Sequence, residues 1–209
     1  MAYYRVGREA LSVMAVVSYA DMRRNYLANF GELIITWNQA EGVLRNLLMS
    51  VCGRSPATYI LTAELGSRGL TDGLNAIAVT QNENVKEAIL AVVILYDRLR
   101  EYRNYYVHGL TAIGVRNGVG FGSANMASAK GKLGFSTDEV PVEQLDDLTK
   151  RLRLLTTASI AILDTIDPQE GSMVPQALPT RATLPIPDRL RKNLRYPLND
   201  PQPPQSEQP

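Results

Sequence analysis

The chain is poor in the side chains that metal sites and disulfides require. Its 209 residues include one histidine, His108, and one cysteine, Cys52. A structural zinc site takes four ligands, mostly from cysteine and histidine, and a disulfide within the chain takes two cysteines. There is also no Walker-type phosphate loop and no second histidine for a zinc site or a Ser-His-Asp set. We therefore expect neither a metal nor a cofactor, and the lone cysteine fits a reducing cytoplasm.

The chain also lacks a charge excess and a long apolar run. Lysine and arginine number 22 and aspartate and glutamate 21, so any contact with RNA has to be local. No apolar stretch reaches the roughly 18 residues of a membrane-spanning helix. The early apolar run from Ala10 to Tyr19 is short and lacks the basic start of a signal peptide. We expect a soluble, cytoplasmic protein with no membrane contact.

Three long stretches repeat apolar residues at helical spacing, which predicts amphipathic helices. The first runs from about Asp21 to Cys52, the second follows an N-cap at Asn82, and the third begins at Pro141 and ends at Asp167. The stripe of the first is Leu27, Phe30, Ile34, Trp37, Glu41, Leu44, Leu48 and Val51. The stripe of the second is Val85, Ile89, Val92, Tyr96, Leu99, Arg103 and Tyr106. The stripe of the third is Val142, Leu145, Leu148, Leu152, Leu155, Ser159, Ile162 and Ile166.

Shorter elements connect these helices. Gly53 can close the first helix, and Ser55-Pro56 can open the next by supplying an N-cap and a first-turn proline. Residues 56–80 then read as one broken helix or two short ones, split near Gly66 to Gly69. Asn117-Gly118 is the preferred pair of a type I′ turn and predicts a β-hairpin. A third short strand near Lys132 to Phe135 could extend this hairpin.

The fold class that follows is all-α. We expect an up-and-down bundle of four to five helices with a small β-hairpin inserted before the last helix. Residues 1–20 form an N-terminal arm with a weak helical preference, and residues 21–167 form the helical domain. Residues 168–209 hold most of the 12 prolines and are expected to be largely disordered. Within this tail, residues 189–196 are a local basic patch that could fold on RNA or on a partner.

Two positions of the predicted inner stripes carry charge. Glu41 lies in the first long helix and Arg103 in the second, where apolar residues are expected. Burying an unpaired charge costs several kcal/mol. Glu41 and Arg103 are therefore either each other's partners or both line a polar cleft that water reaches.

The end of the second long helix contains the candidate catalytic residues. Asn104 and His108 are four residues apart and share one helix face, whereas Arg103 lies roughly 140° from His108 in projection. Fraying of the last turn at Gly109 could bring His108 toward the other two. A metal-independent ribonuclease needs a base for the 2′-hydroxyl and a cation for the phosphate charge, which histidine and arginine supply. Asn104 could orient the imidazole or bind phosphate.

Arginine-asparagine, three further residues and histidine at the end of a long helix in a helical bundle resembles the motif of the HEPN superfamily. The gap of four residues between Arg103 and His108 and the polar residue after the arginine agree with that motif. The stretch from Trp37 to Leu44, which includes Glu41, is similar to the opening helix of some HEPN-like proteins.

The resemblance covers about residues 21–167 and implies a metal-independent endoribonuclease. Such an enzyme leaves 2′,3′-cyclic phosphate and 5′-hydroxyl ends, and it is often a toxin or a phage-defence effector. The resemblance further implies a homodimer with a composite site, in which His108, Arg103 and Asn104 are catalytic. Glu41 and Tyr106 would support them, and an antitoxin or regulatory protein would be a partner.

Other interpretations stay open at this point. His108 could be a cation that the helix dipole stabilises next to a glycine cap, and Arg103 could form a buried structural salt bridge with Glu41. Tyr106 could stack on bases, hold a dimer partner or simply pack. The main alternative function is a non-catalytic HEPN-like module that binds RNA or protein. A structural helical interaction protein is the third.

Overall fold

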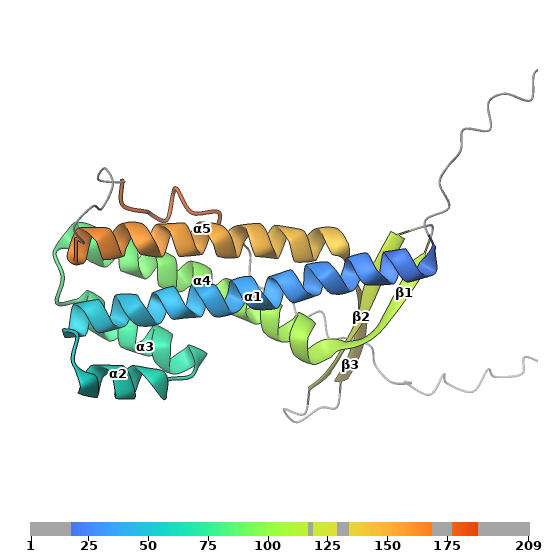
Figure 1. Ribbon diagram of the computed structural model, residues 1–209, viewed down its shortest axis with the longest axis horizontal. Helices are drawn as coiled ribbons and strands as arrows, with labels where there is room; N and C mark the ends of the chain where they lie inside the picture. The colour runs from blue at the N-terminus through green and yellow to red at the C-terminus, as the bar shows by residue number, and fades with distance from the viewer. Residues whose placement is uncertain (1–17, 117–118, 129–133, 169–176, 188–209) are drawn as a thin grey trace, which may run out of the picture.

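The computed structural model of the chain describes residues 18–116, 119–128, 134–168 and 177–187 (Figure 1). Its helices are α1 (Tyr19–Cys52), α2 (Pro56–Ala63), α3 (Ser67–Ala78), α4 (Glu83–Gly109) and α5 (Val142–Ile166). Its strands, β1 (Leu110–Arg116), β2 (Val119–Ser128) and β3 (Gly134–Pro141), form one antiparallel sheet in that order. The predicted helical bundle with a small β element before its last helix is confirmed.

Helices α1 and α5 lie side by side and run in the same direction, and α4 runs the opposite way (Figure 1). Arg153 of α5 pairs with Glu32 of α1 at 2.6 Å, and Arg54, just after α1, pairs with Asp167 at 3.0 Å. These two ion pairs fix the register of α1 and α5 at separate points along their length. The sheet lies where α1 begins and α4 ends, so it closes one end of the bundle.

The inner face of α1 agrees with the predicted one in part. Tyr26, Leu33, Ala40 and Leu47 are all buried and are seven residues apart. With Trp37 and Leu44 between them they form a heptad seam of the kind that suits long parallel helix contacts. The predicted stripe shares Trp37, Leu44 and Leu48 with the buried face but is wrong at its start, where Leu27 is 41% exposed and Tyr26 is buried instead. Glu41 lies at the edge of the seam rather than at its centre.

The predicted helix ends agree with the structure. Asn82 Oδ1 accepts a hydrogen bond from Val85 N at 3.1 Å, and Ser55 Oγ accepts one from Thr58 N at 3.1 Å. Gly53 ends α1 with a positive φ of 83°, which a residue without Cβ adopts at little cost. Of the two alternatives for residues 56–80, the structure has two short helices. Their break lies at residues 64–66, slightly before the predicted position.

The strands are longer than the sequence indicated. Arg116 pairs with Val119, so a two-residue connection lies where the turn was predicted, although Asn117-Gly118 itself falls outside the described residues. The third strand begins at Gly134 and continues to Pro141, beyond the predicted limit at Phe135. Its register brings Val140 opposite Gly122, and Val140 is buried. The sheet therefore contributes to the core.

Residues 177–187 depart from the disorder expected for the whole of 168–209. Leu178, Leu184 and Ile186 pack against the core, and Pro179 is buried. Arg151 of α5 donates a hydrogen bond from Nη1 to the Pro185 carbonyl at 2.5 Å. Prolines exclude regular secondary structure here, but an irregular segment can still bury its apolar side chains. We call residues 177–187 the strap.

The predictions for residues 1–17 and for the basic patch at 189–196 lie outside the described residues. Among the residues that are described, no helix has an apolar stretch long enough to cross a membrane.

Substituting Gly122 by alanine should destabilise the protein. A Cβ at this position in β2 would collide with the hydroxyl of Tyr26 and with Cδ1 of Leu110, and Tyr26 is too deeply buried to move aside. We expect a loss of about 1–3 kcal/mol in the free energy of unfolding, measured in urea. Gly42→Ala is the matched control, because a Cβ there meets nothing within 4 Å and alanine favours a helix by up to about 1 kcal/mol. Equal stability of the two variants would contradict this packing.

Candidate active site

The structure brings Arg103, Asn104 and His108 together on the last two turns of α4. Nη1 of Arg103 is 3.1 Å from Oδ1 of Asn104 and 3.5 Å from Nε2 of His108. The predicted fraying at Gly109 is not needed, because α4 stays helical through that residue. The arginine side chain is long enough to cover the angular offset from His108. Asn104 and His108 are exposed, so a ligand can reach this end of the helix.

Arg103 rests on aromatic rings rather than on a carboxylate. Its guanidinium carbon lies 5.6 Å from the ring centroid of Trp37, within the range of a cation–π contact. Trp37 in turn stacks on Tyr96 with centroids 4.9 Å apart and an interplanar angle of 25°. Both rings are buried. The guanidinium is thus held against a rigid surface while Nη1 faces Asn104 and His108.

Glu41 is hydrogen-bonded to the side chains of both aromatic residues. Its Oε1 accepts hydrogen bonds from the hydroxyl of Ser67 and from the hydroxyl of Tyr96, the latter at 2.5 Å. Nη1 of Arg45 lies 3.7 Å from Oε2. Burial by itself raises the pKa of the Glu41 carboxyl, but the hydrogen bonds and the charge of Arg45 outweigh it and lower the pKa below its usual value. The carboxylate is therefore ionised and well satisfied.

Neither alternative for Glu41 and Arg103 describes their arrangement. Within the described residues Glu41 interacts with Ser67, Tyr96, Arg45 and the side chain of Trp37, and no ion pair joins it to Arg103. The connection is indirect: the carboxylate binds both Trp37 and the Tyr96 hydroxyl, and Arg103 lies over the Trp37 ring. Glu41 can therefore act as a positioning residue without touching a ligand of Arg103.

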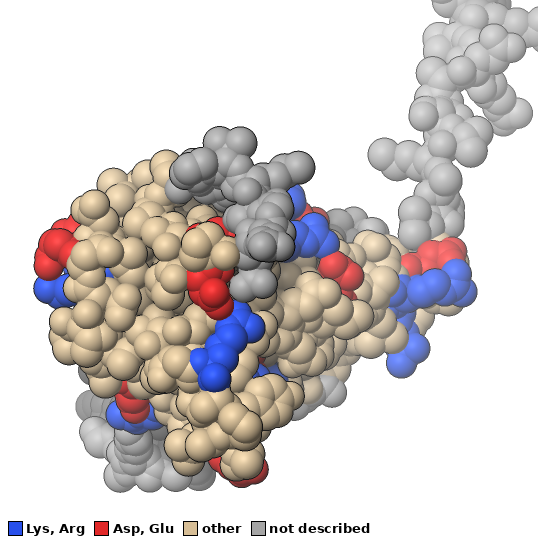
Figure 2. All heavy atoms as spheres, turned by 60° about the vertical axis from the view of Figure 1, so that its left-hand side comes forward, with Lys and Arg blue, Asp and Glu red and all other residues tan. Residues whose placement is uncertain are grey.

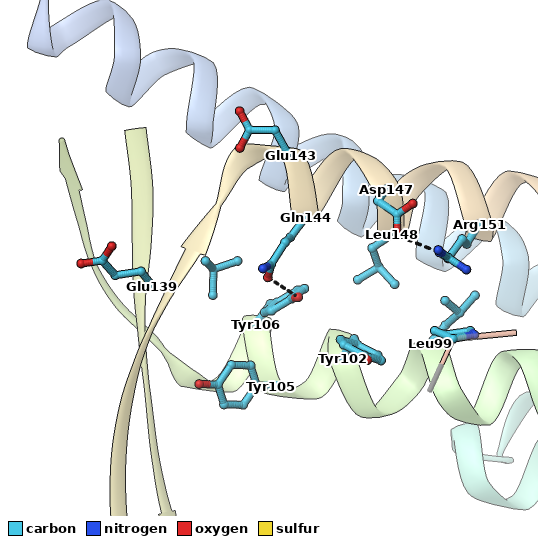
Figure 3. A pocket seen from close by; sticks show the side chains of 12 residues that line it. Leu99, Tyr102, Tyr105, Tyr106, Glu139, Glu143, Gln144, Asp147, Leu148 and Arg151 are labelled. Atoms are coloured by element: carbon cyan, nitrogen blue, oxygen red, sulfur yellow. Dashed lines mark hydrogen bonds and ion pairs between the residues drawn. The ribbon is translucent and has the colours of Figure 1, made fainter. Parts of the chain in front are cut away.

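Tyr106 does not belong to this group. It lies three positions after Arg103, but its side chain contacts α5, where its hydroxyl donates a hydrogen bond to Oε1 of Gln144 at 2.9 Å. Burial raises the pKa of Tyr106 above its usual value, and the side chain is only 5% exposed. It lines a cavity that Figure 3 shows between α4, β3 and α5. Its hydroxyl bonds Gln144 rather than Arg103, Asn104 or His108, and the supporting role of Tyr106 stays a prediction.

Trp37 and Tyr96 contribute to the site although sequence reasoning treated them as core residues. Their positions contained a signal, because Tyr96 precedes Arg103 by seven residues and so shares its helix face. An aromatic residue on the same face as a half-buried arginine can supply a cation–π surface. The sequence could not show that Trp37, on another helix, would lie between them.

The arrangement combines a fixed cation with a group that can exchange protons near neutral pH. Guanidinium N–H groups suit phosphate oxygens, and a histidine ring nitrogen can take or give one proton. On the face of the molecule in Figure 2, lysines and arginines are scattered, and several of them lie beside acidic side chains.

Comparison of the chain with protein-family models, with curated proteins and with solved structures finds no match. The case for a function consequently depends on the residues and their geometry.

Replacing Glu41 by glutamine should make stability less dependent on pH. Because the folded-state pKa of Glu41 is lowered from the ordinary 4.5, the carboxylate stabilises the fold at pH values above 4.5, and this contribution disappears as pH falls through the folded-state pKa. We expect the stability difference between wild type and Glu41→Gln, measured in urea, to shrink below that pH. Glu87→Gln, at an exposed position of α4, controls for the loss of one carboxylate. A difference that stays constant with pH would be inconsistent with this role.

Proposed function

We propose that the protein is a metal-independent endoribonuclease that cleaves RNA by attack of the 2′-hydroxyl. The observation that carries this proposal is the contact of the Arg103 guanidinium with Asn104 and the His108 imidazole at an exposed helix end. RNA carries its own nucleophile, the 2′-hydroxyl, next to the phosphate that is cleaved. A base and a cation that lie side by side can therefore act on these two adjacent groups, the base on the hydroxyl and the cation on the phosphate. The HEPN resemblance implies the same reaction for the same three residues.

The reaction assigns one task to each side chain. Neutral His108 removes the proton from the 2′-hydroxyl, and the 2′-oxygen then forms a bond to phosphorus. Arg103 neutralises the additional negative charge on the phosphate oxygens, and Asn104 holds Arg103 through its side-chain oxygen. The bond from phosphorus to the 5′-oxygen breaks, and that oxygen takes up a proton. The products are a 2′,3′-cyclic phosphate and a 5′-hydroxyl.

A homodimer would supply the second proton-transfer group. One imidazole cannot hold a proton for the leaving oxygen and accept one from the nucleophile at the same moment. Each chain has a single histidine, so a second His108 would have to come from a second copy. The HEPN resemblance implies such a composite site, and it also suggests a toxin or phage-defence role with an antitoxin or regulatory partner.

A non-catalytic HEPN-like binding module is the second candidate. The contact between Arg103 and Trp37 favours it, because an arginine that covers a buried tryptophan has a structural use that needs no chemistry. The near balance of 22 basic and 21 acidic residues also limits affinity for RNA, since phosphate contacts dominate such binding. RNA or protein binding without cleavage by the pure protein would distinguish this function from the first.

Substituting His108 by alanine should abolish most cleavage. A mixed RNA pool is incubated in EDTA with wild type or His108→Ala, and the ends of the products are mapped. We expect wild type to leave cyclic phosphates and the variant to be slower by roughly 10²- to 10⁴-fold, as for loss of an acid–base group. Undiminished cleavage by a folded His108→Ala protein would eliminate this histidine as the base. No cleavage by either protein would favour the binding module.

The role of Arg103 is tested by two substitutions of the same residue. Arg103→Ala should lose cleavage by at least about 10²-fold, the usual effect of removing one group that stabilises transition-state charge. Arg103→Lys keeps the charge but not the paired N–H geometry, so we expect an intermediate rate. Arg98→Ala removes an arginine from the same helix that pairs with Glu101 and serves as the matched control. Equal rates for the two alanine variants would argue against a specific role of Arg103.

A further inference from the structure

A cavity lined by residues of α4, β3 and α5 lies apart from Arg103, Asn104 and His108. It has a volume of about 650 Å³, within the range of ligand pockets, and lies between α4, β3 and the first turns of α5 (Figure 3). Three tyrosines of α4 line it: Tyr102, Tyr105 and Tyr106. Tyr106 lies close to both others, with ring centroids 6.3 Å from Tyr102 and 5.8 Å from Tyr105. The three rings form a continuous aromatic wall.

The charges around this wall favour a cationic occupant. The lining includes the carboxylates of Glu139, Glu143 and Asp147 and a single guanidinium, that of Arg151. Arg151 already pairs with Asp147 at 2.7 Å. The cavity is therefore negative overall, and its aromatic rings add a surface to which ammonium and guanidinium groups are attracted. Arginine and lysine side chains, with an apolar stem and a charged end, suit such a lining.

The strap leads the chain into this cavity. Residues 180–182 lie beside the first turns of α4, where they line a hollow with Glu83 and Lys86. Farther along, the Pro185 carbonyl binds Arg151, and Pro187 forms part of the cavity lining. The strap thus runs along α4 and α5 toward the sheet, and its last described residue is at the cavity.

We propose that residues 188–196 of the same chain occupy the cavity. The residues after Pro187 and Asp188 read Arg-Leu-Arg-Lys-Asn-Leu-Arg-Tyr, with four cations among eight positions. The basic side chains complement the carboxylates, and the leucines and tyrosine complement the apolar part of the wall. An extended chain advances about 3.3–3.6 Å per residue, so Arg189 and Arg191 are within reach of a cavity that Pro187 already lines. The short connection also gives an effective concentration on the order of millimolar.

This binding does not depend on the proposed ribonuclease activity. The cavity is lined by the tyrosines and not by Arg103, Asn104 or His108, which contact one another. A segment bound among the tyrosines leaves the exposed His108 accessible.

Trypsin tests the proposal on the full-length protein, because it cleaves after Arg189, Arg191, Lys192 and Arg195. The initial rate of cleavage at these four bonds in the protein is compared with the rate at the same bonds in a synthetic peptide of residues 188–209. The fragments are identified by mass spectrometry. At millimolar effective concentration we expect on the order of tenfold slower cleavage in the folded protein. Raising the salt concentration should remove much of this protection, since the contacts are ionic and partly exposed.

Two substitutions on α5 test whether the protection from trypsin depends on the cavity. Glu143→Gln should reduce the protection by roughly 1.5- to 5-fold, as for one exposed ion pair. Asp164→Asn removes a carboxylate from the same helix that does not line the cavity, and it should leave the protection unchanged. Cleavage at the rate of the free peptide, or protection that neither salt nor Glu143→Gln alters, would overturn the proposal. Protection that increases with protein concentration would place the segment in a second copy and would also overturn it.

Discussion

The stacked rings of Trp37 and Tyr96 are the contact on which the geometry of the candidate site depends. They lie in the interface between α1 and α4, where close packing prevents either ring from sliding. Glu41 is bonded to the hydroxyl of one ring and Arg103 rests on the face of the other. Two opposite charges are thus placed inside a helical bundle without touching. Each remains available for its own partners, which a direct ion pair would have prevented.

Helix α4 contributes side chains to two different environments near its end. Arg103 contacts Asn104 and His108, whereas Tyr102, Tyr105 and Tyr106 line the cavity against α5 and β3. The first environment is exposed and carries a fixed cation. The second is enclosed by α5 and β3 and faces carboxylates. A stretch of seven residues therefore contributes to both a cationic and an anionic surface, and mutations at neighbouring positions are expected to have unrelated effects.

The sequence was sufficient for the helix ends and for the motif, because both depend on local chemistry. Asn82, Ser55 and Gly53 have capping roles that neighbouring backbone atoms determine, and Arg103 and His108 are joined by one helix. The start of the buried face of α1 was misplaced because Leu27 and Tyr26 are adjacent and both apolar, so only contact with another element decides which is buried. The partner of Arg103 was missed for the same reason, since Trp37 reaches it from a distant part of the chain. The strap was missed because proline content predicts irregularity, not the absence of packing.

The parallel pairing of α1 and α5 has a consequence for how the protein is made. The ion pair between Glu32 and Arg153 joins residues 121 positions apart, and the heptad seam of α1 has its main partner at the far end of the domain. On the ribosome, α1 emerges long before α5. The apolar seam of α1 therefore lacks its α5 partner until α5 has been synthesised. Such late contacts slow folding and expose surfaces that aggregate or recruit chaperones. We expect nascent chains that stop before α5 to be held by chaperones, and the bundle to close only when the last helix is released.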